Sequence, residues 1–284
     1  MPMDHQLNGD HVSALDIRNL IVFSDLDGTL LDHRNYSHSA AAPALARLRH
    51  LEIPLILASS KTAAEITPLR EELGFSDCEA IVENGSGILE AVDEASDEGG
   101  VTETSYQAIR HALERLPSCL HAQYEGFGDW SVQEVSDLTG LSTADAANAR
   151  KRWFSEPGLW LGSEEDKAAF LEAVTAMGLI VQQGGRFLTL SFGGNKAERM
   201  MEIAARHSRQ GMTPFIVALG DAGNDLAMIE QADLGVIIPN PAHSGIPPCE
   251  GEATGRIVRA EAAGPEGWNQ VIMSLLDRTE NNRS

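Results

Sequence analysis

The chain has 284 residues, of which 43% are hydrophobic and 22% are charged, so it is long and apolar enough for one or two packed domains. Its 42 acidic and 21 basic residues give a formal net charge of −21, which repels nucleic acid and anionic membranes and makes both poor partners. No apolar run approaches the roughly 18 residues that a membrane helix needs. A polar N-terminal segment without signal-peptide features and three separated cysteines, Cys78, Cys119 and Cys249, predict a cytoplasmic protein with unpaired thiols.

Short apolar runs along the chain predict strands that are buried on both faces, as in a parallel sheet covered by helices. Segments with the apolar spacing of helices lie between them, and this alternation predicts a doubly wound α/β domain with a parallel sheet. The strand runs are NLIVFSDLDG (19–28), IPLILASSK (53–61), EAIVENG (79–85), PFIVALGDAGND (214–225) and LGVIIPN (234–240). The helical segments are 39–51, 62–74, 196–208 and 223–233.

The pattern changes between residues 88 and 190. An acidic stretch at 90–100 predicts a loop, and residues 179–192 predict a hairpin that turns at Gly184–Gly185. We therefore expect an α+β cap domain, residues 88–190, inserted into a core formed by residues 1–87 and 191–284. Its expected helices lie around 104–116, 131–138, 142–151 and 163–177, with an extended segment at 152–160.

Polar side chains follow several of the predicted strands. In open parallel sheets, ligands bind beyond the carboxyl ends of the strands, so we expect these residues to meet in one crevice. They are Asp25, Asp27, Ser59, Asp221, Asn224 and Asp225, with Lys196 at the head of a helix near the same edge.

These residue types suit phosphoryl transfer. Asp25 and Asp221 supply the hard oxygen ligands that Mg²⁺ prefers, and a carboxylate can act as a nucleophile that forms an aspartyl-phosphate. A second carboxyl group can protonate the leaving oxygen and then activate water. Ser59 and Lys196 can hold the oxygens of the transferring phosphate.

Each of these residues also has a structural interpretation. A calcium loop is excluded, because its sixth and twelfth positions must hold Gly and Glu and here hold Leu30 and Tyr36. An Asp-Gly turn that ends a strand is a stronger alternative, although the order of the motifs favours chemistry. Ser60 or Thr62 can cap the helix after the second strand. Lys196 could be a solvated lysine, but the helix dipole opposes a cation in a first turn.

The motifs together resemble those of the haloacid dehalogenase (HAD) superfamily: DLDGT at 25–29, a serine after the second strand, a downstream lysine, and GDAGND at 220–225. The resemblance implies that Asp25 is the nucleophile, that Asp27 is the general acid/base, oriented by Thr29, and that Ser59 and Lys196 contact phosphate. The presence of a second acid, Asp27, favours phosphatases or phosphomutases within the superfamily. The GDxxND motif is typical of members with a large inserted cap of the C2B-like type. Mg²⁺ would be held by Asp25, the backbone carbonyl of Asp27 and Asp221, with Asn224 or Asp225 in support.

Further stretches are similar to mannosyl-3-phosphoglycerate phosphatases, over about residues 20–275. They are LASSKTAAE at 57–65, ENG at 83–85, SEPGLW at 155–160, GGRF at 184–187 and GPEGW at 264–268. The likeness implies Mg²⁺-dependent release of mannosylglycerate, a compatible solute, and a small phosphorylated sugar-glycerate as the only implied partner. Three alternatives stay open: the glucosyl analogue, a broader sugar-phosphate phosphatase or phosphomutase, and a non-catalytic phospholigand-binding protein. The oligomeric state is also open.

The cap would read the sugar and the glycerate. Arginine grips carboxylates in bidentate fashion, so Arg152 and Arg186 are candidates for the glycerate. Trp153, Trp160 and Phe187 could stack on a sugar face, although aromatic residues on strands are more often core. Trp268 is expected to start the last helix and pack on the core. Further expected substrate contacts are Ser60, Lys61, Asn84, Ser155, Glu156, Gln183 and Asn195.

Overall fold

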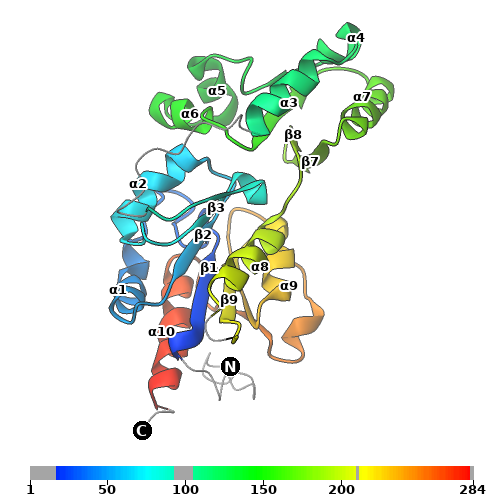
Figure 1. Ribbon diagram of the computed structural model, residues 1–284. Coiled ribbons are helices and arrows are strands. Elements are labelled where there is room, and N and C mark those ends of the chain that lie inside the picture. Colours follow the sequence, from blue (N-terminus) through cyan, green and yellow to red (C-terminus); the bar gives the residue numbers. More distant parts are fainter. Residues whose placement is uncertain (1–16, 93–104, 209–210, 282–284) are drawn as a thin grey trace.

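The computed structural model describes residues 17–92, 105–208 and 211–281, and its two β-sheets lie at different levels of the molecule (Figure 1). We call the seven-stranded sheet the core sheet and the four-stranded sheet the cap sheet. The N-terminal tail and most of the acidic stretch at 90–100 lie outside the described residues. None of the described helices combines the length and the hydropathy that a membrane crossing requires.

The core sheet has the strand order β11-β10-β9-β1-β2-β3-β4, and only β4 runs antiparallel to its neighbour. All five apolar runs form parallel strands of this sheet, as their burial on both faces predicts. The three-residue strands β4 and β11 were not predicted, because they are too short for a periodic signal. The strands are β1 Leu20–Ser24, β2 Leu55–Ala58, β3 Ala80–Val82, β4 Gly87–Leu89, β9 Phe215–Gly220, β10 Leu234–Ile237 and β11 Ile257–Arg259.

Helices α1 and α10 pack against each other, as do α8 and α9, and residues of all four share one apolar cluster with the strands of the core sheet. Trp268 in α10 is fully buried and donates its indole N–H to Ser24 Oγ at 2.9 Å, which ties the last helix to β1 and confirms its structural role. Thr62 caps α2, because its hydroxyl accepts the N–H of Glu65. The helices are α1 Ala42–His50, α2 Ala63–Leu73, α8 Lys196–Arg206, α9 Leu226–Gln231 and α10 Glu266–Asn281. Single 3₁₀ turns cover Ile17–Asn19, Ser39–Ala41, Glu83–Gly85, Gly223–Asp225 and Glu250–Glu252.

The cap sheet is antiparallel, with the order β5-β6-β8-β7. Alternate side chains of its strands face opposite ways: Leu188 and Leu190 pack in an apolar cluster with residues of α3 and α7, whereas Phe187 and Thr189 line a cavity on the other face. The strands are β5 Tyr124–Gly126, β6 Ser155–Trp160, β7 Ile180–Gly184 and β8 Phe187–Ser191, and the helices are α3 Ser105–Glu114, α4 Ser118–His121, α5 Val132–Thr139, α6 Thr143–Ala149 and α7 Glu164–Ala176.

The predicted hairpin is present, but its turn lies one residue later than expected. Gly184 still pairs with Phe187, so the turn is formed by Gly185 and Arg186, and Gly185 takes the left-handed conformation at φ 56°. The core sheet continues through β4 to Leu89 and the cap sheet ends at Ser191. The proposed domain limits at 88 and 190 stay a prediction.

Candidate active site

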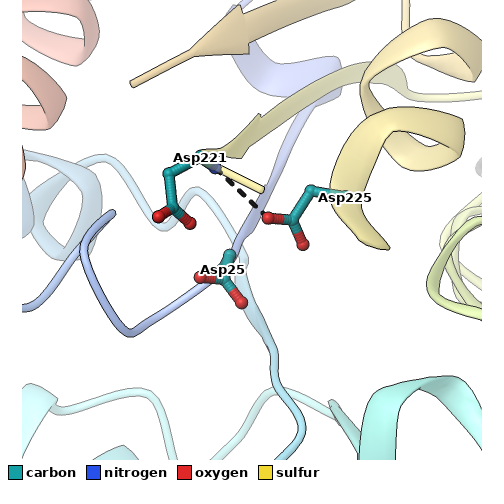
Figure 2. Close-up of side chains that lie close together, drawn as sticks. All are labelled: Asp25, Asp221 and Asp225. Atoms are coloured by element: carbon teal, nitrogen blue, oxygen red, sulfur yellow. Dashed lines mark hydrogen bonds between the residues drawn. The ribbon is translucent and has the colours of Figure 1, made fainter. Parts of the chain in front are cut away.

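Three carboxylates meet at the carboxyl edge of the core sheet (Figure 2). Asp25 directly follows β1 and Asp221 directly follows β9, and the two strands are parallel neighbours, with Ser24 paired to Leu219. Asp225 lies one turn further on. One carboxylate oxygen from each residue lies within 4.8 Å of the others, and all three residues are buried. The sequence-based expectation of one crevice at this edge therefore holds for these three side chains.

Lys196, at the start of α8, lies among these carboxylates. Its Nζ lies 2.6 Å from Asp25 Oδ1 and 2.6 Å from Asp225 Oδ1, and the residue is 1% exposed, so it is not a solvated lysine. Burial lowers the pKa of Lys196, but the charges of Asp225 and Asp25 outweigh it and raise that pKa above its ordinary value. Burial, followed by the charge of Asp225, raises the pKa of Asp25 well above its ordinary value, although Lys196 opposes this. One ammonium thus leaves the cluster with excess negative charge.

Asp27 has different surroundings from Asp25. Its side chain is 40% exposed, and its Oδ2 accepts a hydrogen bond from Lys61 Nζ at 2.8 Å. Its Oδ1 is buried and has no hydrogen-bond partner among the described residues. The hydroxyl of Thr29, expected to orient Asp27, instead donates to Asp221 Oδ1 at 3.2 Å. Within the described part of the chain, Lys61 alone donates a hydrogen bond to the carboxylate of Asp27.

Asp221 has two further partners that sequence reasoning missed. Asn240 Nδ2 lies 2.6 Å and His243 Nε2 lies 2.9 Å from Asp221 Oδ2. Both residues lie in the loop after β10, which is a parallel neighbour of β9. The rule that located Asp221, polar residues just beyond a parallel strand, also applies to this loop and could have found them.

A cavity of about 860 Å³ lies between the carboxyl edge of the core sheet and the cap sheet, and Lys196 lines it, whereas Asp25, Asp221 and Asp225 do not. We call its two sides the core wall and the cap wall. The core wall is formed by Ser60, Glu83, Asn84, Asn195, Lys196 and Asn224, and the cap wall by Phe127, Arg152, Pro157, Gln182, Gln183, Gly184, Phe187 and Thr189. Ser59, 1% exposed, lies just behind the core wall, where its Oγ accepts the N–H of Lys61 at 3.2 Å.

Two of the expected cap contacts line the cavity, Arg152 and Gln183. Ser155 and Glu156 are fully buried elsewhere: Ser155 Oγ donates to Glu83 Oε2, and Glu156 Oε1 accepts from Arg110 and from the N–H of Gly128. The structure does not bring Ser155, Glu156 or the exposed Arg186 to the cavity. Among the aromatic candidates, Phe187 lines the cavity, Trp160 packs against Phe170, and Trp153 is 46% exposed and precedes β6.

Glu83 is a second feature that sequence reasoning missed. It follows β3 with a left-handed φ of 51° and is 1% exposed. Its carboxylate accepts the N–H groups of Trp153 at 2.8 Å and Phe154 at 3.1 Å, and it pairs with Arg152 at 3.2 Å. This carboxylate therefore ties the start of β6 to the carboxyl end of β3. A glutamate directly after a buried strand was the available signal.

Known proteins resemble this chain in sequence and in fold. Residues 22–152 match the family described as haloacid dehalogenase-like hydrolase. A haloacid dehalogenase-like hydrolase from Bacteroides thetaiotaomicron has a similar structure, with a TM-score of 0.60 and 20% identity over 89% of this chain and 98% of that one. The sucrose-phosphatase from Synechocystis sp. PCC6803, solved with sucrose and phosphate, has a TM-score of 0.51 and 16% identity over 91% of this chain and 98% of that one.

The fold is the HAD-like α/β fold, with a mainly parallel central sheet and a separate antiparallel sheet in a cap-like region, consistent with the C2B type. The family match covers fewer than half of the residues of the chain, and the similar structures share its fold.

Proposed function

We propose that this protein is a Mg²⁺-dependent phosphatase that hydrolyses mannosyl-3-phosphoglycerate through an aspartyl-phosphate on Asp25. The observation that carries the proposal is the position of Asp25: its carboxylate contacts Lys196, which lines the cavity of about 860 Å³, and lies within 4.8 Å of two further buried carboxylates. The family match supports the reaction class, and the sequence resemblance supports the particular substrate.

The residues of the cluster fit a divalent metal ion. Three buried carboxylates face a single ammonium group, and hard carboxylate oxygens are the ligands that Mg²⁺ prefers. We assign the ligands to Asp25, Asp221 and the backbone carbonyl of Asp27, with Asn224 or Asp225 in support. Asp225 suits a supporting role, because Lys196 occupies its Oδ1 and the N–H groups of Asp221 and Ala222 occupy its Oδ2. The bound ion would neutralise the negative charge that otherwise repels a phosphate from Asp25.

In the proposed reaction Asp25 attacks phosphorus with Oδ2, because Lys196 holds Oδ1. The bond from phosphorus to the glycerate oxygen breaks, and the carboxyl group of Asp27 gives its proton to that oxygen. Asp27 then takes a proton from water, which attacks the aspartyl-phosphate and releases inorganic phosphate. We assign both proton transfers to the carboxyl group of Asp27, whose side chain is 40% exposed. Ser59 and Lys196 would hold the phosphate oxygens.

The cap wall supports a sugar-containing substrate. Gln182, Gln183 and Thr189 present amide and hydroxyl groups, and the rings of Phe127 and Phe187 meet edge to face at 5.5 Å beside them. Such groups bind sugar hydroxyls and the apolar faces of sugar rings. Arg152 lies on the same wall, where it pairs with Glu83, and we assign the rest of its guanidinium N–H groups to the glycerate carboxylate.

The test is phosphate release from mannosyl- and glucosyl-3-phosphoglycerate, side by side with other phosphosugars, with Mg²⁺ and with a chelator. We expect Mg²⁺-dependent release that is fastest from the mannosyl compound. Faster release from the glucosyl compound would reassign the sugar, and isomerised sugar phosphate with little free phosphate would identify a mutase. A folded protein that releases phosphate from none of them would favour the phospholigand-binding alternative.

A further inference from the structure

The loop after β10 directs two N–H donors at a single oxygen of Asp221. Asn240 Nδ2 and His243 Nε2 lie 2.6 Å and 2.9 Å from Asp221 Oδ2. We infer that Asn240 and His243 are positioning residues, which orient the carboxylate of Asp221 for a divalent cation. The inference rests on the proposed function, in which Asp221 is a metal ligand.

The loop backbone determines which end of the Asn240 amide faces Asp221. Asn240 Oδ1 accepts the N–H of Ala242 at 2.9 Å. Only an oxygen can accept this bond, so the NH₂ group must be the end that points at Asp221. The short turn from 240 to 242 therefore fixes Asn240 as a donor.

The same loop determines the tautomer of His243. His243 Nδ1 lies 3.0 Å from the N–H of Gly245, which donates to it. A ring nitrogen that accepts a hydrogen bond carries no proton, so the proton of the neutral imidazole is on Nε2. Nε2 therefore donates to Asp221 Oδ2. Two backbone N–H groups of one loop thus determine that Asn240 and His243 both act as hydrogen-bond donors to Asp221.

These donors leave the two oxygens of Asp221 unequal. A carboxylate oxygen has about two lone-pair sites, and Oδ2 accepts two N–H groups. From the residues that the structure describes, Oδ1 accepts the hydroxyl of Thr29 alone, at 3.2 Å. Oδ1 is therefore the oxygen with a lone pair left to coordinate a cation. Donors that fix a ligating carboxylate in this way commonly raise metal affinity.

Gly28 of the DLDGT motif provides the space for this arrangement. A Cβ atom at position 28 would lie 2.1 Å from Asn240 Nδ2 and 2.9 Å from Asp221 Oδ2, and the residue has a φ of +86°. A side chain at position 28 would displace the amide from the carboxylate. The glycine thus serves the loop after β10 as well as the turn after β1.

The inference is tested by the affinity of the purified protein for Mn²⁺, measured by calorimetry without substrate, because Mn²⁺ accepts the same oxygen ligands as Mg²⁺. We expect His243→Leu and Asn240→Ala each to weaken Mn²⁺ binding by about 10- to 100-fold. His243→Gln carries an amide N–H near the position of Nε2 and is expected to stay within about threefold of the wild type. Ser244→Ala, an exposed position in the same loop, is the matched control and should leave the affinity unchanged.

Unchanged Mn²⁺ affinity in folded His243→Leu and Asn240→Ala proteins would overturn the inference, and so would a wild-type protein that binds no Mn²⁺. A second measurement needs no destabilising variant: ¹⁵N NMR of the wild-type imidazoles, with His243→Gln to assign the signal. A proton on Nδ1 of His243 would contradict the tautomer on which the inference depends. A protein that binds Mn²⁺ with the expected variant pattern but releases no phosphate would overturn the proposed function and support the inference.

Discussion

The two walls of the cavity hold their polar groups in different ways. On the core wall, Lys196 contacts Asp25, which directly follows β1, and Asp225, which lies one turn after the end of β9, so the ends of two neighbouring parallel strands set their positions. On the cap wall, Arg152 is the only charged lining residue among those described, and the remaining lining residues are amides, a hydroxyl, a glycine, a proline and two aromatic rings. Charge is thus concentrated where we place the phosphate, and neutral groups lie where we place the sugar. The core wall suits chemistry common to many substrates, and the cap wall suits selection among them.

Replacing the nucleophile should have the largest effect. We expect Asp25→Asn to lower kcat on the order of 10³-fold or more, since no other carboxylate of the described residues replaces it at that strand end. Phosphate release under saturating substrate measures this. Asp27→Asn should also lose turnover while keeping Mn²⁺ affinity, because its carboxylate lies outside the buried cluster. Wild-type turnover in either variant would contradict the mechanism.

The same Asp25→Asn variant should be more stable than the wild type without metal. The pKa of Asp25 is raised by burial and by Asp225, so the folded state binds a proton more tightly than the unfolded state does. The free energy of unfolding therefore falls as pH rises above the ordinary Asp value of about 4. Urea unfolding in a chelator at pH 5 and pH 8 measures this. A variant less stable than the wild type at pH 8 would contradict it.

The connection between the walls is expected to depend on Glu83. Glu83→Gln replaces an acceptor-only carboxylate with an amide whose NH₂ group faces N–H donors, so it should cost about 3 kcal/mol of stability and raise KM. Thermal unfolding and KM are the measurements. Glu90→Gln is the matched control, because Glu90 is exposed and pairs with Arg206 on the surface. Equal effects of the two variants would exclude a connecting role for Glu83.

Gln183 and Arg186, neighbours in the hairpin, should differ in their effect on substrate binding. Gln183 lines the cavity and Arg186 does not. We expect Gln183→Ala to raise KM for the sugar-glycerate substrate by about fivefold, because one hydrogen bond to the substrate is lost. Arg186→Ala should leave KM unchanged. Neither variant should affect the hydrolysis of a small aryl phosphate, which does not reach the cap wall. A larger effect from Arg186→Ala would place the sugar elsewhere.

The smallest effect is expected at Glu79, far from either wall. The hydrogen bond from His207, at 2.9 Å, lowers the pKa of Glu79 below its ordinary value. This stabilisation is present at pH values above about 4.3, the pKa of Glu79 in the unfolded chain. It is lost as the pH falls through the lower pKa that Glu79 has in the folded protein. Because Glu79 is partly exposed, we expect less than about 1 kcal/mol between pH 6 and pH 3. Glu79→Gln should flatten that part of the pH profile of unfolding, and an identical profile would exclude the pair as a contributor.

The parallel strands of the core and the residues after them were predictable from sequence. Asp25 and Asp221 follow short apolar runs, and adjacent parallel strands end at one edge, so their meeting follows from the pattern. The contacts of the cap were less predictable. Ser155 and Glu156 lie on a strand that was predicted correctly, yet their side chains point to Glu83 and Arg110 and not to the cavity. Strand alternation determines that neighbours face opposite ways, but not which side is the cavity.

The sequence by itself determined the fold class, the position of the carboxylate cluster at the carboxyl edge of the sheet, and the proximity of Asp25 to Asp221. These depend on local periodicity and on the ends of neighbouring strands. Only the tertiary structure decided that Lys196 lies between Asp25 and Asp225, that Glu83 holds the start of β6, and that the loop after β10 supplies Asn240 and His243 to Asp221. These contacts join segments far apart in the chain. The distances between such segments depend on the packing of whole elements, which no local pattern of residues encodes.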